Sequence, residues 1–448
     1  MSKPFVVERC AEFAAQFQAQ AVPPEVMHHA KRAVVDWYAA LFAGAGDAPA
    51  TLLEKALAGD LDRGNATLAR GRRATARTAA LINATAAHTA EVDDIYREAI
   101  YHPGAPTIAA ALAAGQDAGV SGEAFLRAVI VGYELSTRIG TAMGRAHYRY
   151  WHNTGTIGSF GAAAAGAAVL GLAPKPFAHA LATAATFAAA LQQAFRMDSM
   201  SKPLHAGHAA EAGLLAALGA REGITGSLDV IEGEAGFGRA MGDGPDWELA
   251  LATLGREFNI TEMTFKNHTC CGHTFAAIDG ALELQRQLGV KGGDIKRVHV
   301  ATYRPALEVA GYADPQTPAE ARFSLKYVVA SALTHGSVRL AAFTLERMRD
   351  AGTRALMERI ELAVDPQLDA TFPGQRAARV TITAADGREQ EFLQPTRKGD
   401  PDAPLSDADL EAKYMELSAP AIGEARAGAL VKRLWKLESA PGIADLHG

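Results

Sequence analysis

Basic side chains stand just before several segments of helical character in this 448-residue chain: His102, His152, Lys202 and Lys266. The first peptide N–H groups of a helix are unpaired and carry partial positive charge, which suits a carboxylate or a phosphate. The same field disfavours an extra proton on a neighbouring Lys or His and lowers its pKa toward neutrality. If these helix starts converge, they form a pocket for a small polyanion that contains its own bases.

Two carboxylates lie a short loop before one of these histidines. Asp93 and Asp94 precede His102 by nine and eight residues. A carboxylate so close in the chain can orient an imidazole and stabilise its cation, as acid–base catalysis requires. The alternative is structural: a solvated corner or helix cap at Glu91–Asp94, and basic residues that merely face water.

Other sites for catalysis or cofactors find little support. No G-x-G-x-x-G follows a strand, and there is no phosphate-binding loop or serine nucleophile elbow. The Gly-rich stretch at 233–244 lies among helices and is interpreted as a loop. Asn267–His273 packs two His and two Cys together, but adjacent cysteines suit one metal ion poorly and no second ligand pair follows at zinc-finger spacing. The sequence therefore predicts no metal, no iron–sulfur cluster and no other cofactor.

Composition narrows the class of protein further. Hydrophobic residues make up 49% of the chain, and the net charge is −6, so a nucleic-acid partner is not expected. Three cysteines indicate a reducing compartment, and Glu8 and Glu12 interrupt any signal-like start. Residues 150–174 lack charge but are rich in Gly and Ala, which favours a buried helix over a membrane span. We expect a cytoplasmic protein without a membrane partner.

The elements that must position these side chains are mainly helices. Abundant Ala, aromatics at only 7% and Pro or Gly at segment ends are typical of closely packed helices. Helices are predicted over about 25–44, 74–90, 107–118, 122–143, 156–172, 175–195 and 206–221.

The pattern changes after Gly272. Alternating β-branched stretches predict strands at 295–303, 359–365 and 378–394, the last with a hairpin turn at Asp386–Gly387. Helices are predicted between them at 318–334 and 337–349. The fold class is thus mainly α: a large helical domain (1–270, closed by 405–448) with an inserted, smaller α+β lid domain (271–400). Residues 401–448 supply C-terminal helices that return to the helical domain.

Five blocks of sequence, in order, resemble the MmgE/PrpD family over about residues 7–437. They are VDDIYREAIYHPGAPTIAAALA, HNTGTIGSFGAAAAGAAVLGL, MSKPLHAGHAAEAGLLAALGAREGITG, FKNHTCCGHTFAAIDG and ARFSLKYVVASAL. The family includes 2-methylcitrate dehydratases, cis-aconitate decarboxylases and iminodisuccinate epimerases. The resemblance implies the same two-domain layout, a homodimer and cofactor-free chemistry between the domains.

By position in these motifs, the resemblance implies a set of functional residues. The catalytic set is His102, Asp93, Lys202, His152 and Tyr327. The substrate-binding set is Lys266, Asp94, His205 and Cys270. This chain departs from the family at Ile95, where a threonine is usual, and at HPGAP, where dehydratases typically have HPSDN. The second departure leans away from methylcitrate dehydration.

Three functions stay open at this point. The first is a lyase, dehydratase- or decarboxylase-like, that acts on a small di- or tricarboxylate by proton transfer next to a carboxylate. The second is an epimerase of the iminodisuccinate type, with proton donors on opposite faces such as His102 and Lys202. The third, from a different class, is a non-catalytic polycarboxylate-binding protein.

Overall fold

The chain folds into two compact units, which are described separately. The computed structural model describes residues 3–195, 199–372 and 374–448. Unit 1 comprises Met1–Phe265 and Ser406–Gly448, and unit 2 comprises Lys266–Leu405. The domain boundaries near 270 and 400 stay a prediction of the sequence. The mainly α class is confirmed, whereas a lid role for unit 2 stays a prediction.

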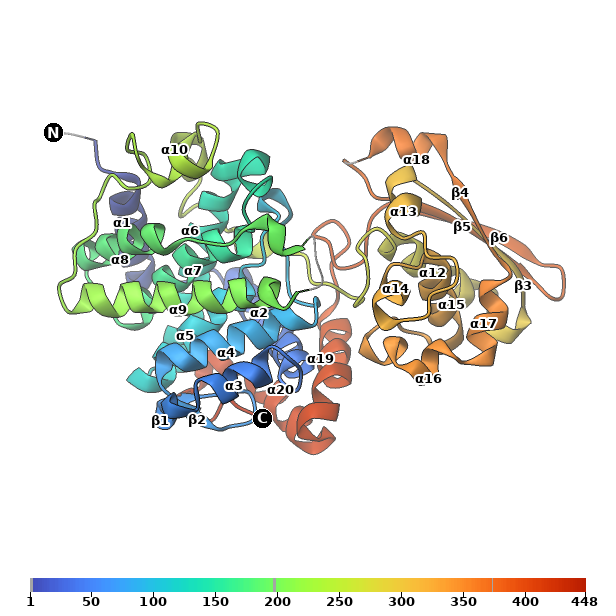
Figure 1. Cartoon of the computed structure of the whole chain (residues 1–448), viewed down its shortest axis with the longest axis horizontal. Coiled ribbons are helices and arrows are strands. Elements are labelled where there is room, and N and C mark those ends of the chain that lie inside the picture. Colours follow the sequence, from blue (N-terminus) through green and yellow to red (C-terminus); the bar gives the residue numbers. More distant parts are fainter. Residues whose placement is uncertain (1–2, 196–198, 373) are drawn as a thin grey trace. The chain divides into compact units, whose positions relative to one another are not determined.

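Unit 1 is built from helices around a core of small side chains, with one short hairpin (Figure 1). Its long helices are α1 (Val6–Ala19), α2 (Pro24–Gly44), α4 (Ala76–Thr89), α5 (Gly104–Ala118), α6 (Gly122–Tyr148), α7 (Asn153–Val169), α8 (Pro174–Phe187), α9 (Ser201–Arg221), α19 (Asp407–Ile422) and α20 (Glu424–Leu434). Shorter elements are α3 (Ala50–Ala56), β1 (Leu61–Thr67), β2 (Arg73–Ala74), α10 (Phe237–Met241) and α11 (Trp247–Leu251). Among the described residues, no helix combines the length and apolar character needed to cross a membrane.

Small residues let the central helices approach closely. Helix α9 packs on α4 and α7, and α5 packs on α4 and α7. A Cβ atom added at Gly213 of α9 would meet the Ser159 carbonyl oxygen at 2.5 Å and the Ala162 Cβ at 2.6 Å, so only glycine fits this α7–α9 crossing. These crossings bring the N-terminal ends of α7 and α9 and the C-terminal end of α4 to one region of unit 1.

Several predicted boundaries are wrong in a way that matters for function. Helices α5, α7 and α9 begin three to five residues earlier than expected, at Gly104, Asn153 and Ser201. Lys202 and His205 therefore lie inside the first turns of α9 rather than before it. The hairpin β1–β2 was missed, and α8 ends at Phe187 rather than near residue 195, because the chain turns extended there to pair Trp151 with Leu191.

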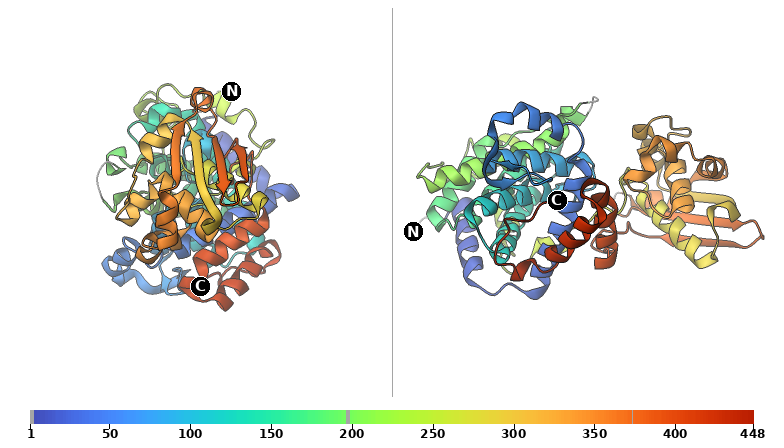
Figure 2. Two further views of the ribbon diagram at one scale, coloured as in Figure 1. Left: turned by 90° about the vertical axis from the view of Figure 1, so that its right-hand side faces the viewer. Right: turned by 90° about the horizontal axis from the view of Figure 1, so that it is seen from below.

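Unit 2 has a four-stranded sheet in the order β4-β3-β5-β6, seen in the left view of Figure 2. The strands are β3 (Ile295–Thr302), β4 (Ile360–Val364), β5 (Ala378–Ala384) and β6 (Glu389–Gln394). β3 pairs parallel with β4 and antiparallel with β5. The predicted β5–β6 hairpin is confirmed, with Thr383 opposite Glu389 and Gly387 at φ +89° in the turn.

Helices of unit 2 pack on this sheet. Helix α12 (Phe275–Leu288) lies on β5 and β6, and α15 (Leu325–His335) packs on α12 and on α17 (Ala351–Met357). The remaining helices are α13 (Arg304–Val309), α14 (Pro318–Arg322), α16 (Leu345–Met348) and α18 (Pro366–Thr371). The predicted helix at 318–334 is broken at Phe323–Ser324, where Ser324 starts α15 by accepting the Tyr327 N–H. The predicted helix at 337–349 is reduced to a 3-10 turn at Leu340–Phe343 and the single turn α16.

Candidate functional site

A tight loop after α4 brings the acidic pair back to His102. Ile95 exchanges two backbone hydrogen bonds of 2.9 Å with Thr264, and Tyr96 exchanges two with Tyr101, of 2.7 and 3.2 Å. Ile100, in the left-handed region at φ +48°, reverses the chain between them. The His102 N–H donates to Thr154 Oγ1 at 3.4 Å, which joins the loop to the start of α7. Asp93 and His102 thus lie side by side at the base of a hairpin-like turn.

The carboxylate of Asp93 lies between two imidazoles. His88 Nδ1 donates to Asp93 Oδ2 at 2.6 Å, and His102 Nδ1 lies 3.3 Å from the same oxygen. Asp93 is 1% exposed and His88 is fully buried, whereas the His102 side chain keeps 12% of its surface exposed. Of this trio, His102 alone reaches solvent, so it is the member that a substrate can touch.

Asp94 faces away from this pair and ties the loop to α5 and α6. Tyr133 Oη donates to its Oδ2 at 2.7 Å, and the Gly104 N–H at the start of α5 donates to its Oδ1 at 3.0 Å. Burial, together with the carboxylates of Asp36 and Asp93, raises the pKa of Asp94 to about 8. Both oxygens serve the fold, which does not support the predicted contact of Asp94 with substrate.

His152 and His205 continue the line of ring contacts from His102 and His88, and these four side chains are the imidazole row. His152 caps α7, its backbone N–H donates to the Ala190 carbonyl at 3.0 Å, and its Nδ1 lies 3.1 Å from His205 Nδ1. Its ring stacks on that of His88, with centroids 5.4 Å apart. Burial and the neighbouring His88 and Lys202 lower the pKa of His152 well below its ordinary value. Burial, then nearby imidazoles and Lys202, lower the pKa of His205 to about 4. Both rings are therefore neutral at neutral pH and suit hydrogen bonding better than proton donation.

Lys202 brings a positive charge to this row. Its ammonium forms an ion pair with Glu91, and the two side chains are 25% and 41% exposed. Glu91 itself sits in the left-handed region at φ +59°, which is unusual for a residue with a side chain. Lys202 is thus paired with the carboxylate of Glu91, which lies in the loop just before Asp93.

Three predicted residues belong to unit 2. Lys266, at the start of the unit, is 9% exposed. Burial raises the pKa of Cys270 to about 12, and its Sγ lies 3.2 Å from Thr274 Oγ1, so it is a thiol and not a thiolate. Tyr327 is fully buried in the unit 2 core, and its hydroxyl donates to the Ala342 carbonyl, which does not support a proton donor. That these residues join His102 stays a prediction.

His88, Asp93 and His102 could also bind a metal ion, because their ligand atoms lie within 4.8 Å of one another. Bonds of about 2.0–2.2 Å to tetrahedral zinc would separate two ligand atoms by about 3.3–3.6 Å. The 2.6 Å between His88 Nδ1 and Asp93 Oδ2 is the distance of a hydrogen bond instead. The arrangement fits a shared proton donor–acceptor system better than a metal centre.

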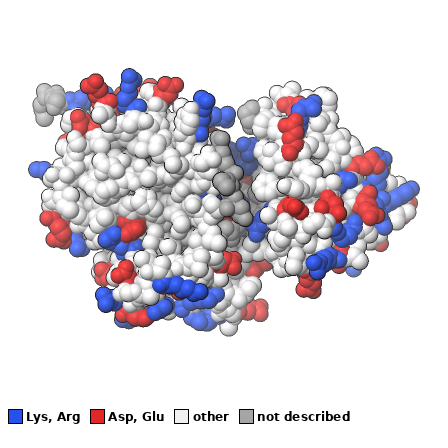
Figure 3. All heavy atoms as spheres, viewed as in Figure 1, with Lys and Arg blue, Asp and Glu red and all other residues white. Residues whose placement is uncertain are grey.

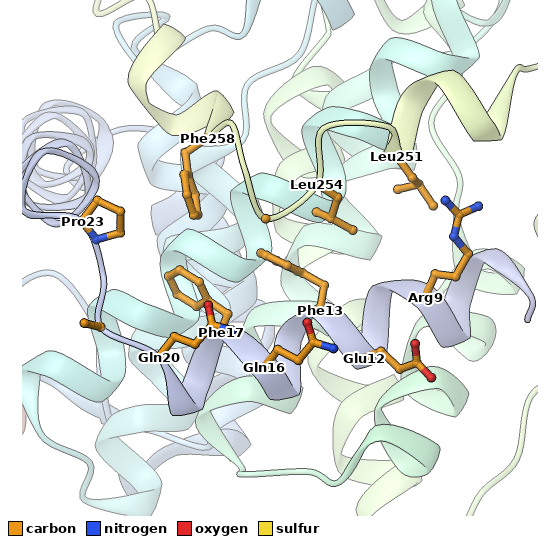
Figure 4. Close-up of a pocket in the computed structure, with 12 residues that line it drawn as sticks. Arg9, Glu12, Phe13, Gln16, Phe17, Gln20, Pro23, Leu251, Leu254 and Phe258 are labelled. Carbon is orange, nitrogen blue, oxygen red and sulfur yellow. The ribbon is translucent and has the colours of Figure 1, made fainter.

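A cavity of about 420 Å³ lies elsewhere in unit 1 (Figure 4). Phe13 and Phe17 of α1 face Leu254 and Phe258 across it, with Arg9 at one end. None of the predicted functional residues lines this cavity, and besides aromatic and amide side chains it offers Arg9 and Glu12 but no imidazole. We therefore place the candidate site at the imidazole row, where titratable groups with altered pKa values gather.

Sequence reasoning gave no functional role to two residues of this site, His88 and Glu91, and none to Tyr133, which holds Asp94 in the fold. His88 precedes Asp93 by five residues at the end of a predicted helix, a spacing that allows a contact but does not require one. Tyr133 lies in the middle of α6 and carried no signal at all. The site offers a partly exposed acid or base (His102) beside a buried carboxylate, neutral hydrogen-bonding imidazoles and an ammonium group.

The chain is similar to known proteins over most of its length. Residues 8–250 match the MmgE/PrpD N-terminal domain, and residues 268–437 match the MmgE/PrpD C-terminal domain. The cis-aconitate decarboxylase-like protein oryM of Aspergillus oryzae is 28% identical, over 95% of this chain and 93% of that protein. The cis-aconitate decarboxylases of Homo sapiens and Aspergillus terreus are 27% and 25% identical, over 80% and 77% of this chain and 76% and 74% of those proteins.

Proposed function

The chain belongs to the MmgE/PrpD family, and from this membership we propose that it is a lyase that decarboxylates a small tricarboxylate of the cis-aconitate type. The observation that carries the proposal is the Asp93–His102 pair, with His102 partly exposed and Asp93 buried behind it. The named activity of the relatives supports decarboxylation over dehydration. The HPGAP motif, which departs from the dehydratase pattern, points the same way.

The chemistry needs one proton delivered to carbon. Loss of carbon dioxide breaks a carbon–carbon bond and leaves its electron pair on the remaining skeleton. His102 supplies the proton that captures this pair, through Nε2, because Nδ1 faces Asp93. The Asp93 carboxylate stabilises the imidazolium before transfer. A proton from solvent then restores His102, so each turnover consumes one proton and releases one carbon dioxide.

The other polar groups would bind the remaining carboxylates. Lys202 exchanges Glu91 for a substrate carboxylate, and Lys266 of unit 2 binds another. His152, neutral and at the start of α7, donates a hydrogen bond, with His205 holding its ring. Asp94, Cys270 and Tyr327 are left out because the fold engages or buries their polar atoms. Each proposed step uses side chains and solvent alone and needs no cofactor.

The test is proton NMR in deuterium oxide against cis-aconitate and a panel of related di- and tricarboxylates. We expect carbon dioxide release and one deuterium on carbon in the product. His102→Asn is expected to lose at least about 100-fold in kcat, the usual scale of general acid–base catalysis. Deuterium exchange without net conversion would indicate an epimerase instead, and a new olefin from a hydroxy acid would indicate a dehydratase.

The matched control is His179→Asn. His179 is also a helix-borne, largely buried imidazole of unit 1, with Nδ1 3.2 Å from the Gly226 carbonyl oxygen, but it contacts none of the site residues. It should retain full turnover. Binding of the panel without turnover of any member would favour the non-catalytic protein, and full activity of His102→Asn would refute the role of His102.

A further inference from the structure

His88 is the one member of the imidazole row with no solvent-exposed surface, and it takes no part in the proposed reaction steps. It lies in the last turn of α4 and is 0% exposed. The titratable groups that face it are Asp93, His102, His152 and His205, on the loop, α7 and α9. Because no substrate can reach His88, any effect on the reaction must pass through one of these groups.

The strongest of these contacts is with Asp93. A carboxylate only accepts, so His88 Nδ1 carries the hydrogen in the 2.6 Å bond to Asp93 Oδ2. The His88 ring cannot turn away, because it stacks on His152 at 5.4 Å and meets the His102 ring edge-on at 4.9 Å. Its Nε2 is buried and has no hydrogen-bond partner among the described residues. Burying a ring nitrogen without a hydrogen-bond partner costs folding free energy. The Nδ1 hydrogen bond to Asp93 is the polar contact that offsets the burial of the His88 ring.

The same oxygen of Asp93 faces both imidazoles. His102 Nδ1 lies 3.3 Å from Oδ2, so the direction of the His102 ring follows from where that oxygen is held. An Asp side chain alone rotates about two bonds, whereas the His88 ring is fixed on a packed helix. We propose that His88 is a positioning residue: by fixing the Asp93 carboxylate, it sets the orientation and protonation of His102.

This inference rests on the proposed function for its rate effect, but not for its structural effect. His88→Phe keeps a flat ring against His152 and removes the donor. His88→Asn restores it, because the Asn amide nitrogen is separated from Cβ by the same number of bonds as Nδ1. If His88→Phe does not fold, His88→Leu takes its place.

In His88→Phe we expect kcat to fall by about 10- to 100-fold, the scale of a misplacement of about 1 Å, with KM little changed. Without the His88 donor, more of the Asp93 charge acts on His102. The limb of the pH–rate profile that reports His102 therefore moves to higher pH. His88→Asn should recover most of kcat and the original limb. His179→Phe, which removes a buried imidazole elsewhere, should change neither.

A second readout does not need turnover. Histidine-labelled protein gives the imidazole titration of His102 by nitrogen-15 NMR, identified by its loss in His102→Asn. A titration that moves to higher pH in His88→Phe and returns in His88→Asn supports the inference even if cis-aconitate is not the substrate. A folded His88→Phe with the wild-type rate, pH profile and His102 titration would overturn it, and so would a folded His88→Asn that behaves like His88→Phe. Failure of the proposed function alone would appear as wild-type protein without decarboxylase activity.

Discussion

Asp93 shows how far the function of one side chain here depends on its neighbours. Its carboxylate meets an imidazole that is fully buried and another that is partly exposed, at 2.6 and 3.3 Å. The adjacent Asp94 has the same chemistry, yet it contacts Tyr133 and Gly104 and is mostly protonated at neutral pH. Sequence proximity to His102 favoured both equally. Only the direction of each side chain in the loop separates Asp93, which is proposed to serve the chemistry, from Asp94, which contacts the fold.

At the same scale, Glu91 occupies the ammonium group that is proposed to bind a substrate carboxylate. It pairs with Lys202, the ammonium proposed to bind a substrate carboxylate, and both side chains are partly exposed. Glu91→Gln keeps the size and removes the competing charge. We expect KM to fall by about two- to fivefold with kcat nearly unchanged, since exposed ion pairs are worth about 0.2–1 kcal/mol. Steady-state kinetics on the accepted carboxylate measures this.

The control for that variant is Glu98→Gln, an exposed acid seven residues further along the same loop that has no ion pair with Lys202. It should leave KM unchanged. A higher KM in Glu91→Gln would mean that Glu91 orients Lys202 rather than competing for it, and the exchange of carboxylates at Lys202 would have to be abandoned.

At the scale of elements, a different part of unit 1 holds each residue of the acidic loop. Lys413 of α19 donates to the Val92 carbonyl at 2.7 Å and to Asp36 Oδ1 of α2 at 2.5 Å. The loop then meets α4 through Asp93, α5 and α6 through Asp94, and Thr264 through Ile95. Loops that carry function are usually mobile. This one is fixed along its length, as preorganised acid–base catalysis requires.

Lys413 therefore has two separable effects. Lys413→Met breaks a pair in which both side chains are 1% exposed, and losing one partner of a buried pair costs about 3–5 kcal/mol of unfolding free energy. It also releases the Val92 carbonyl next to Asp93. We expect both a large loss of stability, measured by chemical denaturation, and a loss of kcat of at least about tenfold.

The double variant Asp36→Asn/Lys413→Met separates the two effects. It removes the uncompensated carboxylate, so most of the stability should return. The Val92 carbonyl is still unheld, so kcat should stay low. If kcat returns together with stability, Lys413 supports the fold alone and does not position the loop.

For the whole molecule, the sequence predicted the features that depend on hydrophobic periodicity and on Gly or Pro at the ends of segments. The helical class, the change of pattern near 270 and the Asp386–Gly387 hairpin follow from local side-chain preferences. The predicted helix at 337–349 failed because it had residues of helical character without the long-range packing that sustains a helix. The packing of α4, α7 and α9 placed His88 in the site, and no local rule specifies such packing.

The homodimer and the cytoplasmic location stay predictions. The face of unit 1 seen in Figure 3 carries few Lys, Arg, Asp or Glu side chains over its middle. Such a face agrees with the abundant Ala of the predicted helices.

The buried titratable groups of the whole molecule predict a stability maximum near neutral pH. His205 and His273, with folded pKa values of about 4 against 6.5, and the likewise lowered His152 bind protons more readily when unfolded. Their contribution to stability is lost as pH falls from 6.5 toward 4. Asp94 and Glu134, raised to about 8 and about 7, bind protons more readily when folded. Their contribution is fully present below their ordinary pKa values of 3.8 and 4.5 and is lost as pH rises from there toward 8 and 7. Below pH 6.5 the three histidines outweigh these two carboxyls.

Chemical denaturation at pH 5, 6.5 and 8 measures this balance, with the highest midpoint expected at pH 6.5. His205→Asn should reduce the loss at pH 5, and Asp94→Asn should reduce the loss at pH 8. A midpoint that rises steadily from pH 5 to pH 8 in the unaltered protein would contradict the prediction.

Lys413 lies in a helix that is synthesised only after all of unit 2. Until then, the Val92 carbonyl and Asp36 lack their buried cation, however well the earlier helices have packed. The contacts of Lys413 with the loop can therefore form only after about 140 intervening residues have been made, the size of an ordinary domain. A product that stops before α19 would be made without the ammonium group that binds Val92 and Asp36.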